Sequence, residues 1–302
     1  MIATTDYDLV TGSVGLVDRS ARGKLRLHGG GVAEFLQGQV TNDVEALASG
    51  EGCYAALLNH KGKLRADMRV SRRAEDWLVD TEPIGLVPVR YTVQTYSLGR
   101  DVRTRDLTEE RVVLSLLGPE SRARLDVAPP GREHASVESG GSLYVATDLG
   151  VDIVAPSEAA EAARALAEPV EEETAECLRI ESGRPRLGRD MDASTMPQEA
   201  GINERAVSFT KGCYVGQETV ARLFYRGKPN RHLRGLRLAE TVQGGESILL
   251  GEREVGKVAS TCVSPTHGPI ALAMVRREAS PGDEVEVGET MATVVELPFA
   301  VS

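Results

Sequence analysis

Six short apolar runs near the C-terminus constrain the fold of this chain more than any other feature. Glycine and proline turns separate the runs, among them Gly244-Gly245 and Pro281-Gly282. Short strands divided by such turns are typical of a small antiparallel barrel. The runs span residues 233–238, 247–250, 255–263, 270–275, 283–287 and 290–295. The sequence therefore predicts a C-terminal antiparallel β-barrel over residues 229–302.

The remaining residues are too many for one further compact core. A chain of 302 residues is expected to form two or three domains. Two β-rich blocks with helices flank residues 50–105, and this middle stretch has strands and a helix of its own. Such an order favours an α+β fold in which one unit is inserted into another. We predict a split α+β domain over 1–49 and 106–228 and an inserted α+β domain over 50–105.

Composition excludes several functional classes. The net charge of −10 is unfavourable for nucleic-acid binding. No apolar run approaches the roughly 20 residues of a membrane span, and the first residues lack the pattern of a secretory signal. The four cysteines form no CxxC pair and the five histidines are scattered, which favours a reducing compartment and no metal site. We expect a cytoplasmic protein that binds neither nucleic acid nor a membrane.

The run KGCYVGQE at residues 211–218 is the strongest candidate for chemistry. It places Cys213 in a glycine-hinged turn, after an expected strand end at 208–210 and before a short amphipathic helix. The free N–H groups and the dipole at a helix N-terminus favour a thiolate, and Lys211 acts in the same direction. The motif therefore predicts a reactive sulfur. A small cysteine that fills a turn is the competing interpretation.

Asp67 is a second candidate. Strands predicted over 53–58 and 64–70 form a hairpin, and Asp67 lies on its returning arm between Ala66 and Met68. A carboxylate in an apolar strand is costly unless it has a partner. Asp67 is therefore either a solvent-facing residue at a sheet edge or a polar group aimed into a pocket.

Five segments together resemble one known family. They are LQGQVTNDV at 36–44, RIESGRP at 179–185, PQEAG at 197–201, KGCYVGQE at 211–218 and VASTCVSP at 258–265. Along almost its whole length the chain is similar to the folate-binding superfamily that contains the glycine cleavage T-protein and the YgfZ-type iron–sulfur maintenance proteins. The form KGCYxGQE is the mark of the YgfZ branch, whereas T-proteins carry a different lysine-containing loop without this cysteine.

The resemblance implies a fold and a cofactor. The fold is α+β, with three domains around a central folate-binding channel: a split ferredoxin-like α+β domain, an inserted α+β domain and the barrel. The cofactor is tetrahydrofolate or a one-carbon derivative of it. Glu181 and Glu199 occupy the family's positions for acidic folate contacts. One carboxylate can accept hydrogen bonds from the adjacent amino group and ring N–H of a pteridine.

Asp67 matches the second of two adjacent acids that face the reactive nitrogens of the folate in T-proteins. The first acid is replaced by Ala66 here. In the T-protein this acidic pair handles the proton chemistry at the one-carbon unit. The loss of one acid disfavours aminomethyl transfer but leaves a carboxylate that can orient a bound folate. The residues that we expect to contact folate are Asp67, Glu181, Glu199, Gly212, Tyr214, Gln217 and Arg222.

Three functions follow from these residues. The first is a tetrahydrofolate-binding accessory protein for the assembly or repair of iron–sulfur enzymes, with transient contacts to those enzymes or to assembly proteins. In it Cys213 is the essential thiol, Lys211 lowers its pKa, and Asp67 completes the predicted catalytic group. The second is an aminomethyltransferase of the T-protein type or a related folate-dependent demethylase, in which Asp67 is the acid or base and Cys213 is incidental. The third is a folate-binding regulator without chemistry.

Overall fold

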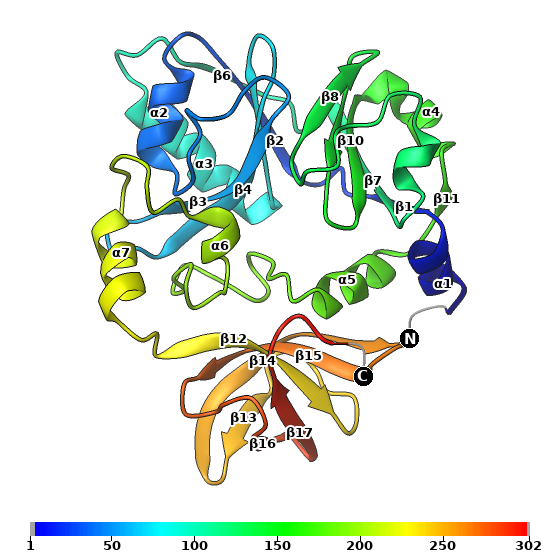
Figure 1. Ribbon diagram of the computed structural model, residues 1–302, viewed down its shortest axis with the longest axis vertical. Helices are drawn as coiled ribbons and strands as arrows, with labels where there is room; N and C mark the ends of the chain where they lie inside the picture. Colours follow the sequence, from blue (N-terminus) through cyan, green and yellow to red (C-terminus); the bar gives the residue numbers. More distant parts are fainter. Residues whose placement is uncertain (1–3, 301–302) are drawn as a thin grey trace. The chain divides into compact units, whose positions relative to one another are not determined.

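A computed structural model describes residues 4–300 (Figure 1). The chain forms two compact units by its internal contacts. One comprises residues 8–170 and 203–219, and the other comprises residues 4–7, 171–202 and 220–300. Two open sheets lie in the first unit and a closed barrel lies in the second. The predicted α+β class with a C-terminal antiparallel barrel is confirmed.

The first sheet has five antiparallel strands in the order β3-β4-β5-β2-β6. Helix α2 begins after Gly31 and buries Val32, Phe35 and Leu36, the apolar face that the spacing of the sequence predicts. Helix α3 packs on strands β2 and β4, and Pro83 occupies its first turn, where a missing N–H costs nothing. The elements are β2 (Gly23–His28), α2 (Val32–Gln39), β3 (Gly52–Leu58), β4 (Leu64–Arg72), β5 (Trp77–Thr81), α3 (Pro83–Tyr96) and β6 (Arg103–Asp106).

The second sheet has six strands in the order β11-β1-β7-β10-β9-β8, of which only β1 and β11 run parallel. Helix α4 contributes Ala163 to the core of this sheet. Helix α1, which the sequence reading did not predict, precedes β1. The elements are α1 (Thr4–Gly12), β1 (Gly15–Asp18), β7 (Arg111–Leu117), η1 (Ser121–Arg124), β8 (Ser136–Ser139), β9 (Ser142–Ala146), β10 (Gly150–Pro156), η2 (Ser157–Ala159), α4 (Ala160–Arg164) and β11 (Glu168–Pro169).

Strand β2 shows where the chain crosses between these sheets. It pairs with β5 and β6, whereas β1 pairs with β7. The boundary predicted at residues 49–50 therefore falls inside the stretch that builds the five-stranded sheet. A shared core joins the sheets, in which Leu78 of β5 packs with Val113 of β7 and Val154 of β10.

Three further helices carry or flank the predicted site segments. They are α5 (Glu172–Glu181), α6 (Asn203–Ala206) and α7 (Gln217–Arg226). Gly183 follows α5 with a φ of 66°, as expected for a glycine that ends a helix. The strand end predicted at 208–210 is wrong, because residues 209–210 form a bend and the N–H of Ser208 bonds the carbonyl of Thr41 outside any strand.

The barrel closes in the order β12-β15-β14-β13-β16-β17, with every neighbouring pair antiparallel. Alternate residues of each strand point inward and fill it, among them Leu236, Val258 and Val294. Helix α5 packs outside it, where Ile180 meets Leu272. The strands are β12 (Arg231–Leu238), β13 (Ser247–Leu250), β14 (Arg253–Ser264), β15 (Gly268–Arg276), β16 (Glu284–Val287) and β17 (Thr290–Val295).

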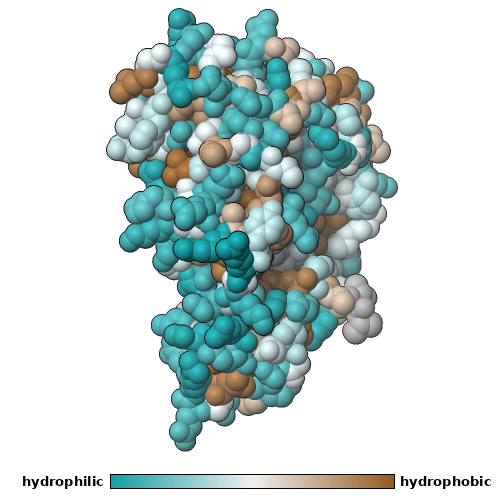
Figure 2. Space-filling model, turned by 60° about the vertical axis from the view of Figure 1, so that its left-hand side comes forward, coloured by the Kyte–Doolittle hydropathy of each residue, from teal (hydrophilic) through white to brown (hydrophobic). Residues whose placement is uncertain are grey.

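Figure 2 shows one face on which charged and polar residues predominate and hydrophobic residues gather only in small groups. Among the helices of residues 4–300, none combines the length and the apolar character that crossing a membrane requires.

Candidate functional site

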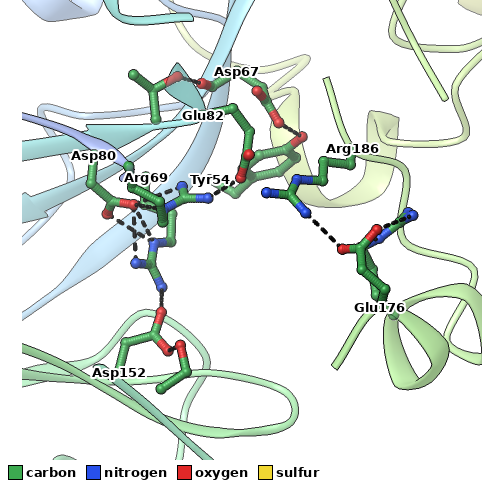
Figure 3. A network of polar contacts seen from close by, with 12 residues as sticks. Tyr54, Asp67, Arg69, Asp80, Glu82, Asp152, Glu176 and Arg186 are labelled. Atoms are coloured by element: carbon green, nitrogen blue, oxygen red, sulfur yellow. Dashed lines mark hydrogen bonds and ion pairs between the residues drawn. The ribbon is translucent and has the colours of Figure 1, made fainter. Parts of the chain in front are cut away.

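Asp67 is a buried carboxylate with one free oxygen. It lies on β4 with 8% of its surface exposed, and the Tyr54 hydroxyl of the neighbouring strand donates to its Oδ2 at 2.7 Å (Figure 3). Within the described part of the chain, Oδ1 has no hydrogen-bond partner. Burial raises the pKa of Asp67 to about 6, and the bond from Tyr54 only partly opposes this. The carboxylate is therefore the polar group aimed inward, not a solvent-facing residue at a sheet edge.

A network of charged residues, which sequence reasoning did not identify, braces the strands beside Asp67. Arg69, two positions further along β4, bonds Asp80 of β5 at 2.8 Å and also pairs with Asp152 of β10 (Figure 3). Arg22 binds Asp80 as well and reaches Glu82. These arginines hold the pKa of Asp80 down to about 2, although its burial acts in the opposite direction. The network ties the two sheets together and leaves Asp67 outside its ion pairs.

Lys211 is an anchor in this structure. Its ammonium donates to the carbonyl oxygens of Gln37, Val40 and Asn42 at 2.6, 2.7 and 2.9 Å. These bonds use all three ammonium hydrogens at the C-terminal end of α2, where unpaired carbonyls attract a cation. Burial lowers the pKa of Lys211 to about 8. The ammonium hydrogens are directed to these carbonyls, and the influence of the Lys211 charge on Cys213 stays a prediction.

Cys213 is exposed on the loop that Lys211 fixes. The next residue, Tyr214, is buried, and its ring lies 5.2 Å from the Lys211 ammonium. Helix α7 begins only at Gln217, whose N–H bonds the carbonyl of Tyr214. Cys213 thus precedes the first turn of α7, and its side chain is exposed.

Gly216 holds the same loop on the β3–β4 hairpin. It has a φ of 86°, and an added Cβ would lie 2.5 Å from the carbonyl oxygen of Asn59 and 3.2 Å from Cα of Gly62. Gly62 itself has a φ of 73°, as the sequence predicts for that turn. The loop that carries Cys213 is therefore seated on the turn that connects the strands of Tyr54 and Asp67.

Alanine substitution of the two motif glycines is expected to separate their roles. Gly216→Ala should lower the free energy of unfolding by at least about 1–3 kcal/mol, because a side chain is strained at this φ and meets backbone atoms. Gly212→Ala is the matched control, since Gly212 lacks a positive φ and an added Cβ would touch nothing within 4 Å. Urea denaturation of both variants measures the difference. Equal stabilities would contradict the close packing at Gly216.

Glu181, the last residue of α5, accepts hydrogen bonds from within its own compact unit. Tyr7 donates to both of its oxygens, at 2.9 and 3.1 Å, and Ser264 donates to Oε1 at 2.5 Å. Its main-chain carbonyl accepts the N–H of Phe299. The side chain is thus held in one orientation by the surroundings of α5.

Glu199 connects the long polar loop to the barrel. Its carboxylate accepts the N–H of Met196 at 2.9 Å and pairs with Arg231 of β12 at 3.1 Å. Its main-chain carbonyl accepts the N–H of Leu233 at 2.8 Å. Glu199 therefore stabilises the loop and holds it against strand β12.

The two compact units divide the predicted residues. Asp67, Lys211, Gly212, Cys213, Tyr214 and Gln217 belong to the unit with both sheets, whereas Glu181, Glu199 and Arg222 belong to the unit with the barrel. Arg222 is exposed on α7, and burial raises the pKa of Tyr214 to about 12. Across residues 4–300, no three His, Cys, Asp or Glu side chains gather as a metal site would require.

A buried arginine cluster is the feature of α5 that sequence reasoning missed. Arg179 binds Glu176 and Asp190 at 3.0 and 2.7 Å and donates to Ser260 of β14 at 2.8 Å. Its guanidinium also bonds the carbonyl of Arg184. The signal was present in the segment RIESGRP, because an arginine on the inner face of a helix needs acidic partners. The cluster fixes α5 and the following loop on the barrel.

Two family models match this chain. The GCVT N-terminal domain matches residues 2–134, and the glycine cleavage T-protein C-terminal barrel domain matches residues 231–300. Together they cover more than half of the chain. The protein belongs to the glycine cleavage T-protein family.

Relatives of more than one kind are found in this family. The chain is 30% identical to an aminomethyltransferase of Rubrobacter xylanophilus, over 97% of this chain and 85% of the relative. It is 27% identical to the tRNA-modifying protein YgfZ of Yersinia enterocolitica, over 91% of this chain and 89% of the relative. The crystal structure of the glycine cleavage system aminomethyltransferase T from Bartonella henselae has the same fold, with a TM-score of 0.88 at 22% identity, covering 98% of this chain and 89% of that one.

Proposed function

We propose that the protein binds tetrahydrofolate or a one-carbon derivative and assists the assembly or repair of iron–sulfur enzymes through Cys213. The observation that carries this proposal is an exposed thiol on a loop that is fixed at both ends. Lys211 fixes one end by binding three carbonyls of segment 37–42, which we call the carbonyl cage, and Gly216 fixes the other end on the hairpin. A loop held in this way presents its sulfur in a defined place, which a transient contact with a partner protein requires.

Asp67 supplies the chemical argument for a folate. A buried carboxylate oxygen without a donor is costly, and a ligand N–H would relieve that cost. Tetrahydrofolate offers such N–H groups and, when bound, supplies a carrier for one-carbon units. With a pKa of about 6, Asp67 is mostly ionised at neutral pH and can accept the bond. Tyr54 orients the carboxylate through its other oxygen.

The other two proposed acidic contacts already have hydrogen-bond partners within the protein. Glu181 and Glu199 already accept bonds from their own surroundings, yet an ionised carboxylate has about four acceptor positions, so each retains capacity for a pteridine. We also propose Gly212, Tyr214, Gln217 and Arg222 as contacts of the ligand.

Aminomethyl transfer is the second candidate function, and the aminomethyltransferase relative favours it. Ala66 argues against it. This residue is fully buried on β4 and stands where the T-protein resemblance places the first of two adjacent acids. Asp67 alone then lacks the neighbour with which it would share the proton chemistry.

Two measurements on the purified protein separate these functions. Calorimetric titration with tetrahydrofolate is expected to show one site. Incubation with an aminomethylated lipoyl carrier and tetrahydrofolate is expected to give no methylenetetrahydrofolate above background. Robust turnover would establish the transferase instead, and absence of any folate binding would refute both candidates. In a strain that lacks the protein, the activity of [4Fe–4S] enzymes is expected to fall.

A further inference from the structure

Two cysteines that are distant in the sequence approach each other beside Glu181. Cys177 lies on α5 and Cys262 on β14, 85 positions apart, and their sulfurs are 3.1 Å from one another. A disulfide requires about 2.05 Å, so closure needs a movement of about 1 Å. Both residues belong to the unit that contains the barrel.

The surroundings give the two thiols different properties. Cys177 is fully buried, whereas Cys262 is partly exposed and packs against the cluster of Ile180, Leu233 and Leu272. The Cys177 thiol also donates to Oε1 of Glu181 at 3.6 Å, and contact with Cys262 together with burial raises the pKa of Cys177. The pair therefore has an accessible sulfur, a protected sulfur and an adjacent proton acceptor.

We propose that Cys177 and Cys262 form a redox-active pair that a small disulfide closes into an intramolecular disulfide. Cys262 attacks the reagent RS–SR: a bond forms between Cys262 and one reagent sulfur, the reagent S–S bond breaks, and RS⁻ leaves and takes up the Cys262 proton. Cys177 then passes its proton to Glu181 and attacks the sulfur of Cys262. The bond between Cys262 and the reagent sulfur breaks, and the second RS⁻ leaves and takes up that proton. Two protein thiols are oxidised by two electrons, and one reagent disulfide is reduced to two thiols.

Closure has a defined structural effect. The new bond joins α5 to β14 and removes the thiol hydrogen that Cys177 donates to Glu181. Ser264, on the same strand as Cys262, remains the donor to that oxygen. Oxidation thereby acts on the last turn of α5. The disulfide itself does not depend on folate binding.

The test uses the full-length chain with glutathione disulfide as the probe. In a Cys213→Ser background three cysteines remain, so the exposed thiol does not compete. After incubation, quenching and denaturation, we expect loss of two of the three thiols and a cross-linked peptide pair that contains residues 177 and 262. Cys53 remains free as the internal control, because it is buried and so shielded from the reagent, whereas Cys177 is reached from within the pair through Cys262.

Two variants in that background resolve the order of steps. Cys177→Ser is expected to stop at a stable glutathionyl adduct on Cys262, and Cys262→Ser is expected to react little. Survival of all three thiols, or a stable adduct on Cys262 while Cys177 is present, would overturn the proposal. Peptide mapping of the unsubstituted protein also shows whether residues 177 and 262 become cross-linked. The result therefore does not depend on whether a variant folds.

Discussion

Replacing Cys213 with serine is expected to reduce the activity of [4Fe–4S] enzymes to the level of a strain that lacks the protein. Serine preserves the size of the side chain but provides neither a thiolate nucleophile nor a soft ligand. Because Cys213 is exposed, stability and folate affinity should change little, by less than about 0.5 kcal/mol or roughly twofold in Kd.

The matched control is Thr210→Ala, a change at an exposed residue of the same segment. In the same strain, the Thr210→Ala protein should restore the activity of the [4Fe–4S] enzymes to the level that the unsubstituted protein gives. Full restoration by the Cys213→Ser protein would show that the thiol is dispensable and would support a regulator without chemistry. A serine variant that also loses folate binding would indicate that Cys213 acts in the ligand site.

Asp67→Asn is expected to weaken tetrahydrofolate binding and, at neutral pH, to stabilise the protein without ligand. Loss of a charge-assisted hydrogen bond costs about 1.5–3 kcal/mol, which is roughly a 10- to 150-fold increase in Kd. The gain in stability arises because the folded state disfavours the charged carboxylate, as its pKa of about 6 against an ordinary 3.8 shows. A shift of this size corresponds to about 3 kcal/mol above pH 6.

The pH dependence of the Asp67→Asn effect follows from the direction of the shift. A raised carboxyl pKa means that the folded state binds the proton more tightly, so the cost of Asp67 is absent below pH 4 and grows as the pH rises to 6. The difference in Tm between the two proteins should therefore be large at pH 7.5 and vanish near pH 4. Tyr54→Phe is the control: it removes the donor to Oδ2 and should lower stability at neutral pH. An unchanged folate Kd in Asp67→Asn would place the ligand elsewhere.

Local patterns in the sequence predicted local structure well. The six barrel strands match the predicted runs closely. The hairpin of β3 and β4 was also predicted. In each case the signal lies within a few residues, because alternation, helical spacing and turn glycines act over that distance.

Contacts between distant residues were not predictable in this way. Lys211 and Cys213 are neighbours in sequence, yet the Lys211 side chain turns to carbonyls of segment 37–42. Cys177 and Cys262 gave no recognisable spacing, because a helix and a barrel strand bring them together. The pairing of β2 with β5 and β6 escaped prediction for the same reason. Membership of the family was predicted and is confirmed.

The carbonyl cage around Lys211 has a consequence for the order of events during synthesis. The ammonium and the carbonyl of Gln37 are 174 positions apart. At ribosomal rates of about 5–20 residues per second, the end of α2 emerges roughly 10 to 35 s before the lysine that completes it. Until then the carbonyls of Gln37, Val40 and Asn42 lack the ammonium that they bind in the folded protein. The loop with Cys213 can be fixed only after Lys211 has bound these carbonyls. A ribosome-bound chain truncated before residue 203 should therefore fold its first sheet with the end of α2 still loose.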